Sequence, residues 1–335
     1  MKTLYLILAL VIGSANGFTQ VTKGVDDLID DEKKLKKVTT DSTDGWQRGG
    51  LVNINFTQVS LTNWAAGGQN SISLAGFSSL FANYKQGKST WDNTLVMQFG
   101  QVKQGGNSFV KSDDRLQFTS KYGRDAGKNW YYAALFDFQT QFTVGYSESN
   151  NSATRISDFM APAYFLGALG MDYKPNKNFT LFIAPVTAKY TVVNDDSLAF
   201  EGAYGVQGFK VDNDGTVTNF ENTRLEIGGY LRVNYKKQIM ENITYQSNLG
   251  LFSNYTNNPQ NIDVNWDNIL NMKVNKYISA SITTSLIYDD DVKIAVLKDD
   301  GTPKVRADGA TPEVGPRTQL KYVLGVGFAY TFGDK

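Results

Sequence analysis

The chain has 335 residues, contains neither cysteine nor histidine, and balances 33 lysines and arginines with 33 aspartates and glutamates. Without histidine it lacks the commonest general base and zinc ligand, which excludes the Ser-His-Asp and Cys-His arrangements of hydrolases. The balanced charge gives no field that would attract nucleic acid, and the absence of cysteine excludes both disulfides and the lipid-modified cysteine of a lipoprotein. We therefore predict that the protein is not an enzyme, needs no cofactor or metal, and binds no nucleic acid.

Residues 1–17 have the three parts of a secretory signal peptide. A basic start is followed by an apolar run from Leu4 to Ile12 and by the small-residue exit Ala15-Asn16-Gly17. This run is shorter than the roughly 20 residues that a helix needs to cross a bilayer. We predict cleavage before Phe18, and we predict that the highly charged residues 18–45 form a periplasmic tail.

From Gly49 onward the chain alternates apolar and polar residues, which is the period of a strand with one dry face and one wet face. A clear case places Tyr132 and Phe136 on one face, and Ala133 and Asp137 on the other. The pattern predicts twelve strands, with boundaries uncertain by roughly two to four residues. The predicted strands span 49–60, 69–84, 90–103, 114–123, 129–144, 159–174, 178–193, 223–236, 240–256, 262–274, 277–289 and 318–333.

Strands of this length suit tilted crossings of a membrane, so residues 46–335 are predicted to form an all-β, antiparallel, up-and-down transmembrane β-barrel of about 12 strands. The connections alternate between short turns and longer loops, of which 194–222 and 290–317 are the longest. Bacterial outer-membrane barrels have short periplasmic turns and long extracellular loops. The barrel is therefore predicted to lie in the outer membrane, in contact with its lipid. With an even number of strands, both termini are expected in the periplasm. A soluble β-rich binding protein is the alternative fold.

Aromatic residues recur at one end of strand after strand, as expected for rings that prefer the membrane–water interface. The predicted periplasmic girdle comprises Tyr84, Trp91, Tyr122, Trp130, Tyr173, Phe179, Tyr235, Tyr277 and Phe332. Its outer counterpart comprises Trp64, Phe142, Phe159, Tyr190, Trp266, Tyr288 and Tyr322. A β-sandwich would explain the alternation but not these two rows.

One strand changes phase. Up to Ile183 the residues of the dry face occupy the odd-numbered positions, whereas from Val186 onward they occupy the even-numbered positions. Pro185 lies between the two halves. Proline inside a strand is usually tolerated only at a bulge or an edge. The sequence therefore predicts a β-bulge near Ala184-Pro185.

The wet faces of the predicted strands carry charges of both signs. The residues expected to line the lumen are Arg115, Lys121, Asp137, Asp172, Arg224, Glu226, Arg232, Asp263, Asp267, Lys273 and Lys321. Two interpretations are open: a constriction that selects a solute by charge, or ion pairs that fill and stabilise the barrel. The mixture of signs favours the second interpretation, because a selective pore would show a bias.

Two acidic peptides, Asp212-Asn213-Asp214-Gly215 and Asp289-Asp290-Asp291, offer oxygen atoms that calcium could use. Neither has the full spacing of a calcium-binding loop. Asp-Gly pairs are common turn formers, so we interpret these peptides as turns and predict no metal site.

The segment from Gln58 to Gly68, with Trp64-Ala65-Ala66-Gly67-Gly68 at its end, resembles a Bacteroidota outer-membrane β-barrel family catalogued only as a domain of unknown function. The resemblance implies the location and the fold, but no activity. The aromatic last strand, Tyr322 to Phe332, resembles the signal that the barrel-assembly machinery recognises, although this chain ends in Gly333-Asp334-Lys335. The Trp64 turn is expected in the first extracellular loop, either as a functional loop or as a tight turn.

Two functions stay open from the sequence. The first is a passive or selective channel for a small solute, with the lumen charges and the two longest loops deciding what enters. The second is a non-transporting structural or assembly component that docks to other envelope proteins. An outer-membrane enzyme is a third alternative that no motif supports.

Overall fold

The computed structural model describes residues 44–61, 69–149, 152–211, 215–275, 278–296, 298, 304–306 and 313–333. The predicted signal peptide, nearly all of the charged tail, the Trp64 turn and Asp212-Asn213-Asp214 lie outside these residues. The predictions made for those segments stay predictions. Within the described residues, no helix has the length and apolar character needed to cross a membrane.

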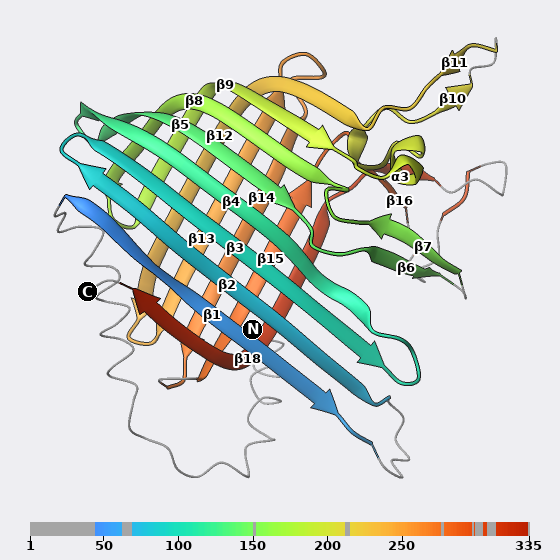
Figure 1. Ribbon diagram of the computed structural model, residues 1–335, viewed down its shortest axis with the longest axis horizontal. Coiled ribbons are helices and arrows are strands. Elements are labelled where there is room, and N and C mark those ends of the chain that lie inside the picture. The colour runs from blue at the N-terminus through green and yellow to red at the C-terminus, as the bar shows by residue number, and fades with distance from the viewer. Residues whose placement is uncertain are drawn as a thin grey trace, which may run out of the picture.

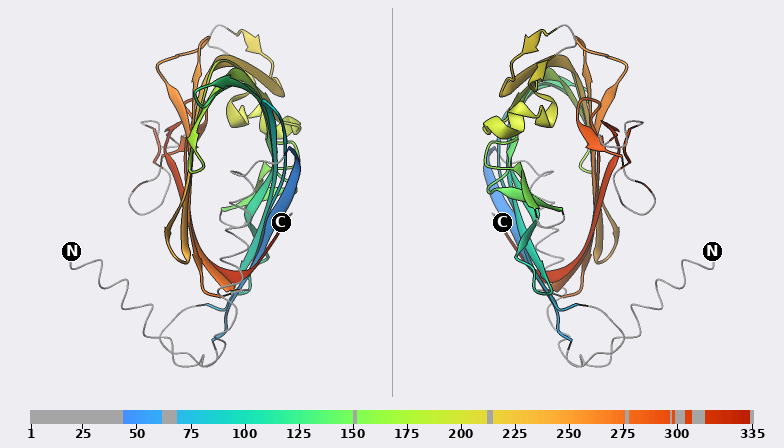
Figure 2. Two further views of the ribbon diagram at one scale, coloured as in Figure 1. Left: turned by 90° about the vertical axis from the view of Figure 1, so that its left-hand side faces the viewer. Right: turned by 90° about the vertical axis from the view of Figure 1, so that its right-hand side faces the viewer.

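The described chain is built around a closed barrel of twelve antiparallel strands, each paired with its neighbours in the sequence order of the barrel, with the last paired to the first (Figure 1). The barrel strands are β1 (Gly45–Val59), β2 (Ser71–Gln86), β3 (Ser89–Gln104), β4 (Val110–Gly127), β5 (Trp130–Thr140), β8 (Ala163–Asn176), β9 (Phe179–Val192), β12 (Thr223–Met240), β13 (Ile243–Asn254), β14 (Ile262–Lys273), β15 (Ile278–Tyr288) and β18 (Gln319–Gly333). The predicted antiparallel up-and-down barrel is confirmed. Its outline seen from either end is an elongated ellipse (Figure 2).

Strand boundaries differ from the prediction where side chains bind the backbone of a loop. β5 ends at Thr140 rather than 144, because the Thr140 hydroxyl donates to the Pro162 carbonyl and accepts from the Met160 amide. β4 begins at Val110 rather than 114, and the buried Asp114 carboxylate binds the amides of Phe142 and Thr143. Phe142 and Phe159 therefore lie in a loop and not in the predicted strands.

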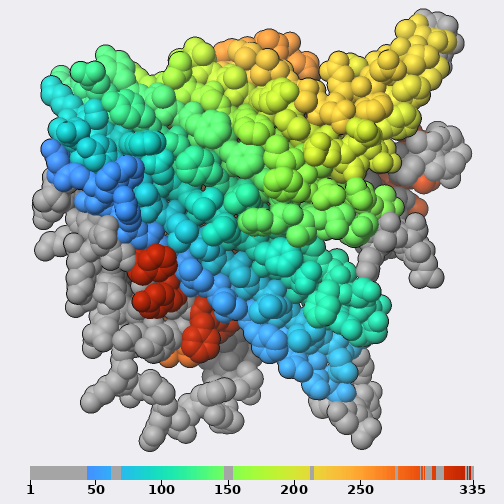
Figure 3. Space-filling model, in the orientation of Figure 1, coloured from blue at the N-terminus to red at the C-terminus, as the bar shows by residue number. Residues whose placement is uncertain are grey.

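The two faces of the barrel wall differ as the alternation requires. On β5, Tyr132 points outward and is 63% exposed, whereas its neighbour Ala133 and the nearby Leu135 point inward and are buried. The same parity runs through neighbouring strands because the register pairs outward residues with outward residues. In the space-filling view, side chains of β1 to β9 cover this outer wall without a break between adjacent strands (Figure 3).

The predicted bulge is present. Val186 pairs with Leu169 of β8, but Ile183 pairs with Met171, so the ladder shifts at Ala184-Pro185. The ladder with β12 shifts at the same place. As a result Ile183 and Val186 both face outward, although they are three residues apart. Gly170 faces the shift, where a Cβ would overlap the Ile183 carbonyl.

Aromatic side chains form a row at the end of the barrel where short turns connect the strands. Trp46 contacts Tyr84 and Trp91 with ring centroids 5.1 and 5.8 Å apart, and Trp130 contacts Tyr173 at 4.8 Å. Trp46 belongs to this row although the sequence did not single it out. Tyr277 of the predicted girdle lies outside the described residues.

The long loops emerge together at the other end and carry short elements (Figure 1). These elements are β6 (Gly145–Ser149), β7 (Ser152–Ser157), α3 (Asp196–Phe200), the 3-10 helix η1 (Ala203–Gly205), β10 (Lys210–Val211), β11 (Val217–Thr218), β16 (Lys293–Ala295) and β17 (Val314–Pro316). A small apolar core packs the loop before β8 against α3 and η1 through Ala161, Val193, Leu198, Ala199 and Val206. We call these two extremities the short-turn end and the long-loop end.

Candidate functional site in the barrel lumen

All eleven predicted lumen residues have the inward parity of their strands. Several of them contact inward residues on strands that are not neighbours in the barrel, and these contacts lie inside the lumen. The set comprises Arg115 and Lys121 on β4, Asp137 on β5, Asp172 on β8, Arg224, Glu226 and Arg232 on β12, Asp263, Asp267 and Lys273 on β14, and Lys321 on β18. Most of these charges, with partners that the sequence did not identify, form three tiers along the barrel axis.

The short-turn tier is balanced in charge. Lys121 Nζ lies 2.6 Å from Asp172 Oδ2, and Lys174 Nζ lies 3.4 Å from the same atom and 3.1 Å from Asp92 Oδ2. Lys174 also lies over the ring of Tyr131, 5.2 Å from its centroid. The Asp172 side chain is 1% exposed, whereas Asp92 is partly exposed, so this tier is an ion-pair network with a buried centre that connects β3, β4 and β8.

The central tier spans the narrow dimension of the lumen. Arg115 on β4 and Asp267 on β14 form an ion pair of 3.5 Å, and six steps around the ring of twelve strands separate β4 from β14 in either direction. Asp267 also accepts a hydrogen bond from Ser285. Arg232 pairs with Asp137 at 3.8 Å in the same tier. The Arg115–Asp267 pair therefore braces opposite walls and divides the lumen into two sides.

The long-loop tier has an excess of negative charge. Lys189 lies 3.4 Å from Glu226, 3.0 Å from Asp263 and 3.5 Å from Asp289. Arg224 pairs with Glu226 at 3.0 Å and with Asp291, and it donates to the carbonyl of Gly205 in η1. Two cations thus face four carboxylates, and one of the cations ties the lumen to the loops above it.

The loop that contains α3 is held by a second ion pair. Asp195 is the N-cap of α3 and accepts from the Leu198 amide, while Arg155 Nη1 lies 2.6 Å from the other carboxylate oxygen. The amide hydrogen bond and the guanidinium hold the pKa of Asp195 below its usual range. Tyr204 in η1 donates to the Ile156 carbonyl, and burial raises the pKa of its hydroxyl to about 12.

The two sides of the lumen differ in packing. On the packed side, which we define as the inward faces of β5, β8, β9, β12 and β13, the buried residues Ala133, Leu135, Ala168, Phe182 and Ala184 form an apolar cluster. On the seam side, defined as the inward faces of β1, β2, β15 and β18, the side chains are mostly small and half-exposed. Among the described residues of those four strands, the inward charges are Lys85 and Lys321, which lie at opposite ends.

Several lumen residues were missed by the sequence analysis. Lys189 is the most connected of them, and its inward parity depends on the bulge at Pro185, which the sequence did signal. Asp92 and Lys174 lie near strand ends, and Asp289 and Asp291 follow β15, where alternation is a weak guide. Lys321 pairs with Asp113 on β4, two residues from Arg115 of the central tier. Within the described chain, no group of three or more acidic side chains is arranged to hold a metal ion.

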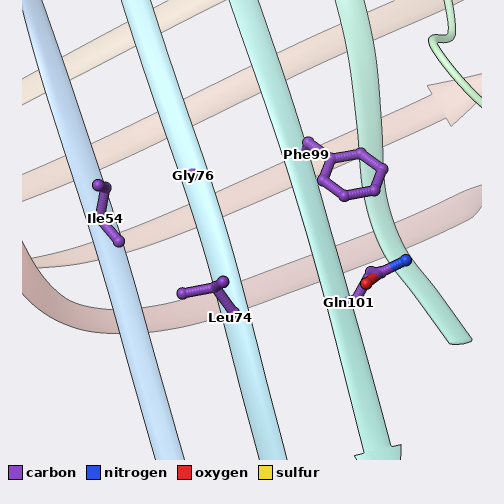
Figure 4. Close-up of a pocket in the computed structure, with 5 residues that line it drawn as sticks. All are labelled: Ile54, Leu74, Gly76, Phe99 and Gln101. Carbon is purple, nitrogen blue, oxygen red and sulfur yellow. The ribbon is translucent and has the colours of Figure 1, made fainter. Parts of the chain in front are cut away.

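A hollow of about 250 Å³ lies on the outer face of the barrel and not in the lumen (Figure 4). Ile54 of β1, Leu74 and Gly76 of β2, and Phe99 and Gln101 of β3 line it. Gly76 forms its floor because neighbouring strands present side chains where Gly76 has none.

Residues 56–146 match the family described as "Protein of unknown function (DUF3078)". The resemblance to a family of unknown function is thus confirmed for this part of the chain, while the bacterial phylum stays a prediction. The comparison with curated proteins gives no match.

Several solved barrels have low similarity to this chain. The translocator domain of the autotransporter NalP from Neisseria meningitidis has a TM-score of 0.34 and 11% identity, over 92% of this chain and 98% of that one. An outer membrane channel from Pseudomonas putida F1 has a TM-score of 0.37 and 11% identity, over 87% and 97%. The NanC porin has a TM-score of 0.33 and 11% identity, over 85% and 98%. Scores at this level assign no function to the chain.

Proposed function

We propose that the protein is an outer-membrane β-barrel that conducts a small uncharged solute along the seam side of its lumen. The closed barrel leaves no free sheet edge over most of its wall, and its outward face is apolar, with Leu225, Leu320 and Phe328 among the most exposed side chains. Together with the predicted signal peptide, this supports an outer-membrane location, with the long loops outside the cell and both termini in the periplasm.

The main support for a conduit is that the two sides of the lumen differ in how tightly side chains fill them. Buried apolar residues and ion pairs fill the packed side, where a solute would have to break salt bridges and open a close-packed cluster. Along the seam side the wall consists of residues such as Ser79, Ser281 and Thr283, which are small, uncharged and half-exposed to the interior. Such a wall offers hydroxyl groups to a polar solute, and in the described part of these four strands its inward charges are confined to Lys85 and Lys321 at opposite ends.

Liposome swelling with the purified full-length protein tests this function. We expect entry of a small uncharged sugar, and we expect Ser281→Trp to reduce it because the indole would occupy the seam side. Ala280→Trp is the matched control, since the adjacent residue has outward parity and its indole would lie in lipid. No sugar entry into vesicles that hold folded wild-type protein would contradict the conduit, as would equal effects of the two substitutions.

The Arg115–Asp267 brace supports a second candidate, a closed barrel with a structural or assembly role. Planar-bilayer conductance separates the two candidates. A conduit is expected to conduct weakly and to conduct better with Asp267→Asn, which removes the brace. Glu313→Gln, in an exposed ion pair of the last long loop, is the control. A folded barrel that is silent in both forms would favour the structural role and a search for envelope partners.

A further inference from the structure

The seam between the first and last strands is closed along only part of its length. β1 and β18 pair from Gly49 with Gly333 to Asn55 with Gly327, which is the shortest ladder in the barrel. Beyond that point both strands continue, but residues 56–59 of β1 and 319–326 of β18 have no pairing with each other. In Figure 1 the blue β1 and the red β18 diverge toward the long-loop end.

Side-chain exposure changes where the pairing stops. In the paired part of β1, Gly49 and Gly50 are buried and residues 51–55 alternate between half-buried and exposed, whereas all four residues of 56–59 are exposed. The same holds for residues 319–324 of β18, whose inward and outward side chains are both exposed. Val323 has inward parity and is 39% exposed. In the part of the chain that the structure describes, the wall is therefore open at this level, and the seam side of the lumen communicates with the outside.

The opening lies at the level of an apolar surface. Leu320, Leu324 and Val326 have outward parity beside the unpaired edge and are exposed. Unpaired backbone N–H and C=O groups cost several kcal/mol each in hydrocarbon, and they are tolerated at membrane depth only where they line a water-filled cavity. The half-exposed polar wall of the seam side supplies such a cavity. Water and lipid would therefore meet in this opening.

The hollow on the outer face lies beside the opening. Ile54, which lines it, is the last outward position of β1 before the pairing ends, and Leu74 and Phe99 add further apolar surface (Figure 4). Gln101 adds one amide at the rim. A hollow with three apolar side chains and one uncharged polar group fits a molecule of the same composition.

We propose that the seam is a lateral opening through which a small, uncharged, amphipathic molecule passes between the lumen and the outer leaflet, with the hollow as its seat on the lipid side. This inference rests on the proposed conduit, whose solute class it narrows. In this route the molecule leaves the lumen through the barrel wall and does not leave at the opposite end of the barrel.

The chain has no cysteine, so a disulfide can close the seam selectively. Continuing the register of β1 and β18 places Gln58 opposite Leu324, so oxidation of Gln58→Cys with Leu324→Cys would lock the two edges together when they approach to the spacing that a disulfide requires, and loss of the free thiols would show that the link has formed. Val52→Cys with Tyr330→Cys is the matched control, because these residues already pair in the closed part. The probe is N-phenyl-1-naphthylamine, which is uncharged and amphipathic and becomes fluorescent when it enters cells that carry the protein.

We expect oxidation of the Gln58–Leu324 pair to reduce probe entry to the level of cells without the protein, and reduction to restore it. The control pair should have no effect. Sugar entry into liposomes should persist in the oxidised protein, since the lumen is unchanged. Probe entry that is unaffected by closing the seam, while sugar still enters, would overturn the lateral opening alone. Absence of sugar entry from the start would overturn the conduit and this inference together.

A second variant tests the hollow without any cross-link. A Cβ at Gly76 meets nothing closer than the Phe99 carbonyl at 3.9 Å, so Gly76→Leu would fill the hollow without displacing the backbone. We expect it to slow probe entry and leave sugar entry unchanged. Ser78→Leu is the control, because it has the same outward parity on β2 but lies outside the lining of the hollow. Equal probe entry in both variants would overturn the seat.

Discussion

The packed side and the seam side of the barrel are made from the same alternating strands, yet they use their inward positions differently. On β9 the inward Phe182 is 1% exposed and packs among alanines, while on β2 the inward Phe77 is only half-buried. The packed side behaves like the core of a soluble protein enclosed by strands. Closure of a barrel therefore does not by itself fix its interior, because side-chain size and charge decide which part is filled.

The largest expected effect compares the two phenylalanines. Phe182→Ala should destabilise the barrel by about 3–5 kcal/mol, because it leaves a cavity in a close-packed cluster. Phe77→Ala should cost distinctly less, since part of that ring is already exposed. Reversible urea unfolding in lipid vesicles measures both free energies. Equal losses would show that the seam side is packed as tightly as the packed side.

The next effect concerns a buried charge on the packed side. Glu226 is nearly inaccessible and contacts both Lys189 and Arg224, so Glu226→Ala would leave two cations without their shared partner. We expect a loss of about 3 kcal/mol in unfolding free energy. Because Arg224 also binds Gly205, cleavage by trypsin in the loop 193–222 should become faster.

Glu313→Gln serves as the control for that prediction. Glu313 pairs with Lys304 in an exposed loop, where an ion pair contributes about 0–1 kcal/mol. A loss for Glu226→Ala that is no larger than this would mean that the long-loop tier is solvated, and the packed side would then lose its distinction.

The sequence predicts part of the difference between the packed side and the seam side. Strand number, order and parity follow from the local period of apolar residues, and the bulge follows from Pro185 between two phases. Contacts across the lumen do not follow, because the pairing of Arg115 with Asp267 depends on the flattening and stagger of the whole barrel. The open seam is likewise invisible in either strand alone, since β18 alternates over its full length.

A smaller effect is expected for the ion pairs that connect opposite parts of the barrel wall. A double-mutant cycle with Arg115→Ala and Asp267→Ala should give a coupling energy of about 1 kcal/mol, because both side chains are partly exposed and Asp267 also accepts a hydrogen bond from Ser285. The same cycle for Lys321 and Asp113, whose lysine is half-exposed, should give less. A larger coupling at Lys321 would place the stronger brace on the seam side.

The smallest effect is a pH response of the loop that covers the packed side. The folded pKa of Asp195 lies below its usual value, chiefly through the Leu198 amide and also through Arg155. Its ionised form therefore stabilises the loop above the ordinary aspartate pKa of about 3.9, and this contribution is lost as the pH falls through the folded value. We expect pepsin to cleave within 193–222 more readily as the pH drops through this window. Asp195→Asn keeps the cap acceptor without the titration, so its cleavage should not show this pH dependence. If both proteins respond alike, the loop opens through another group, and the tie between Arg224 and Gly205 becomes the next bond to test.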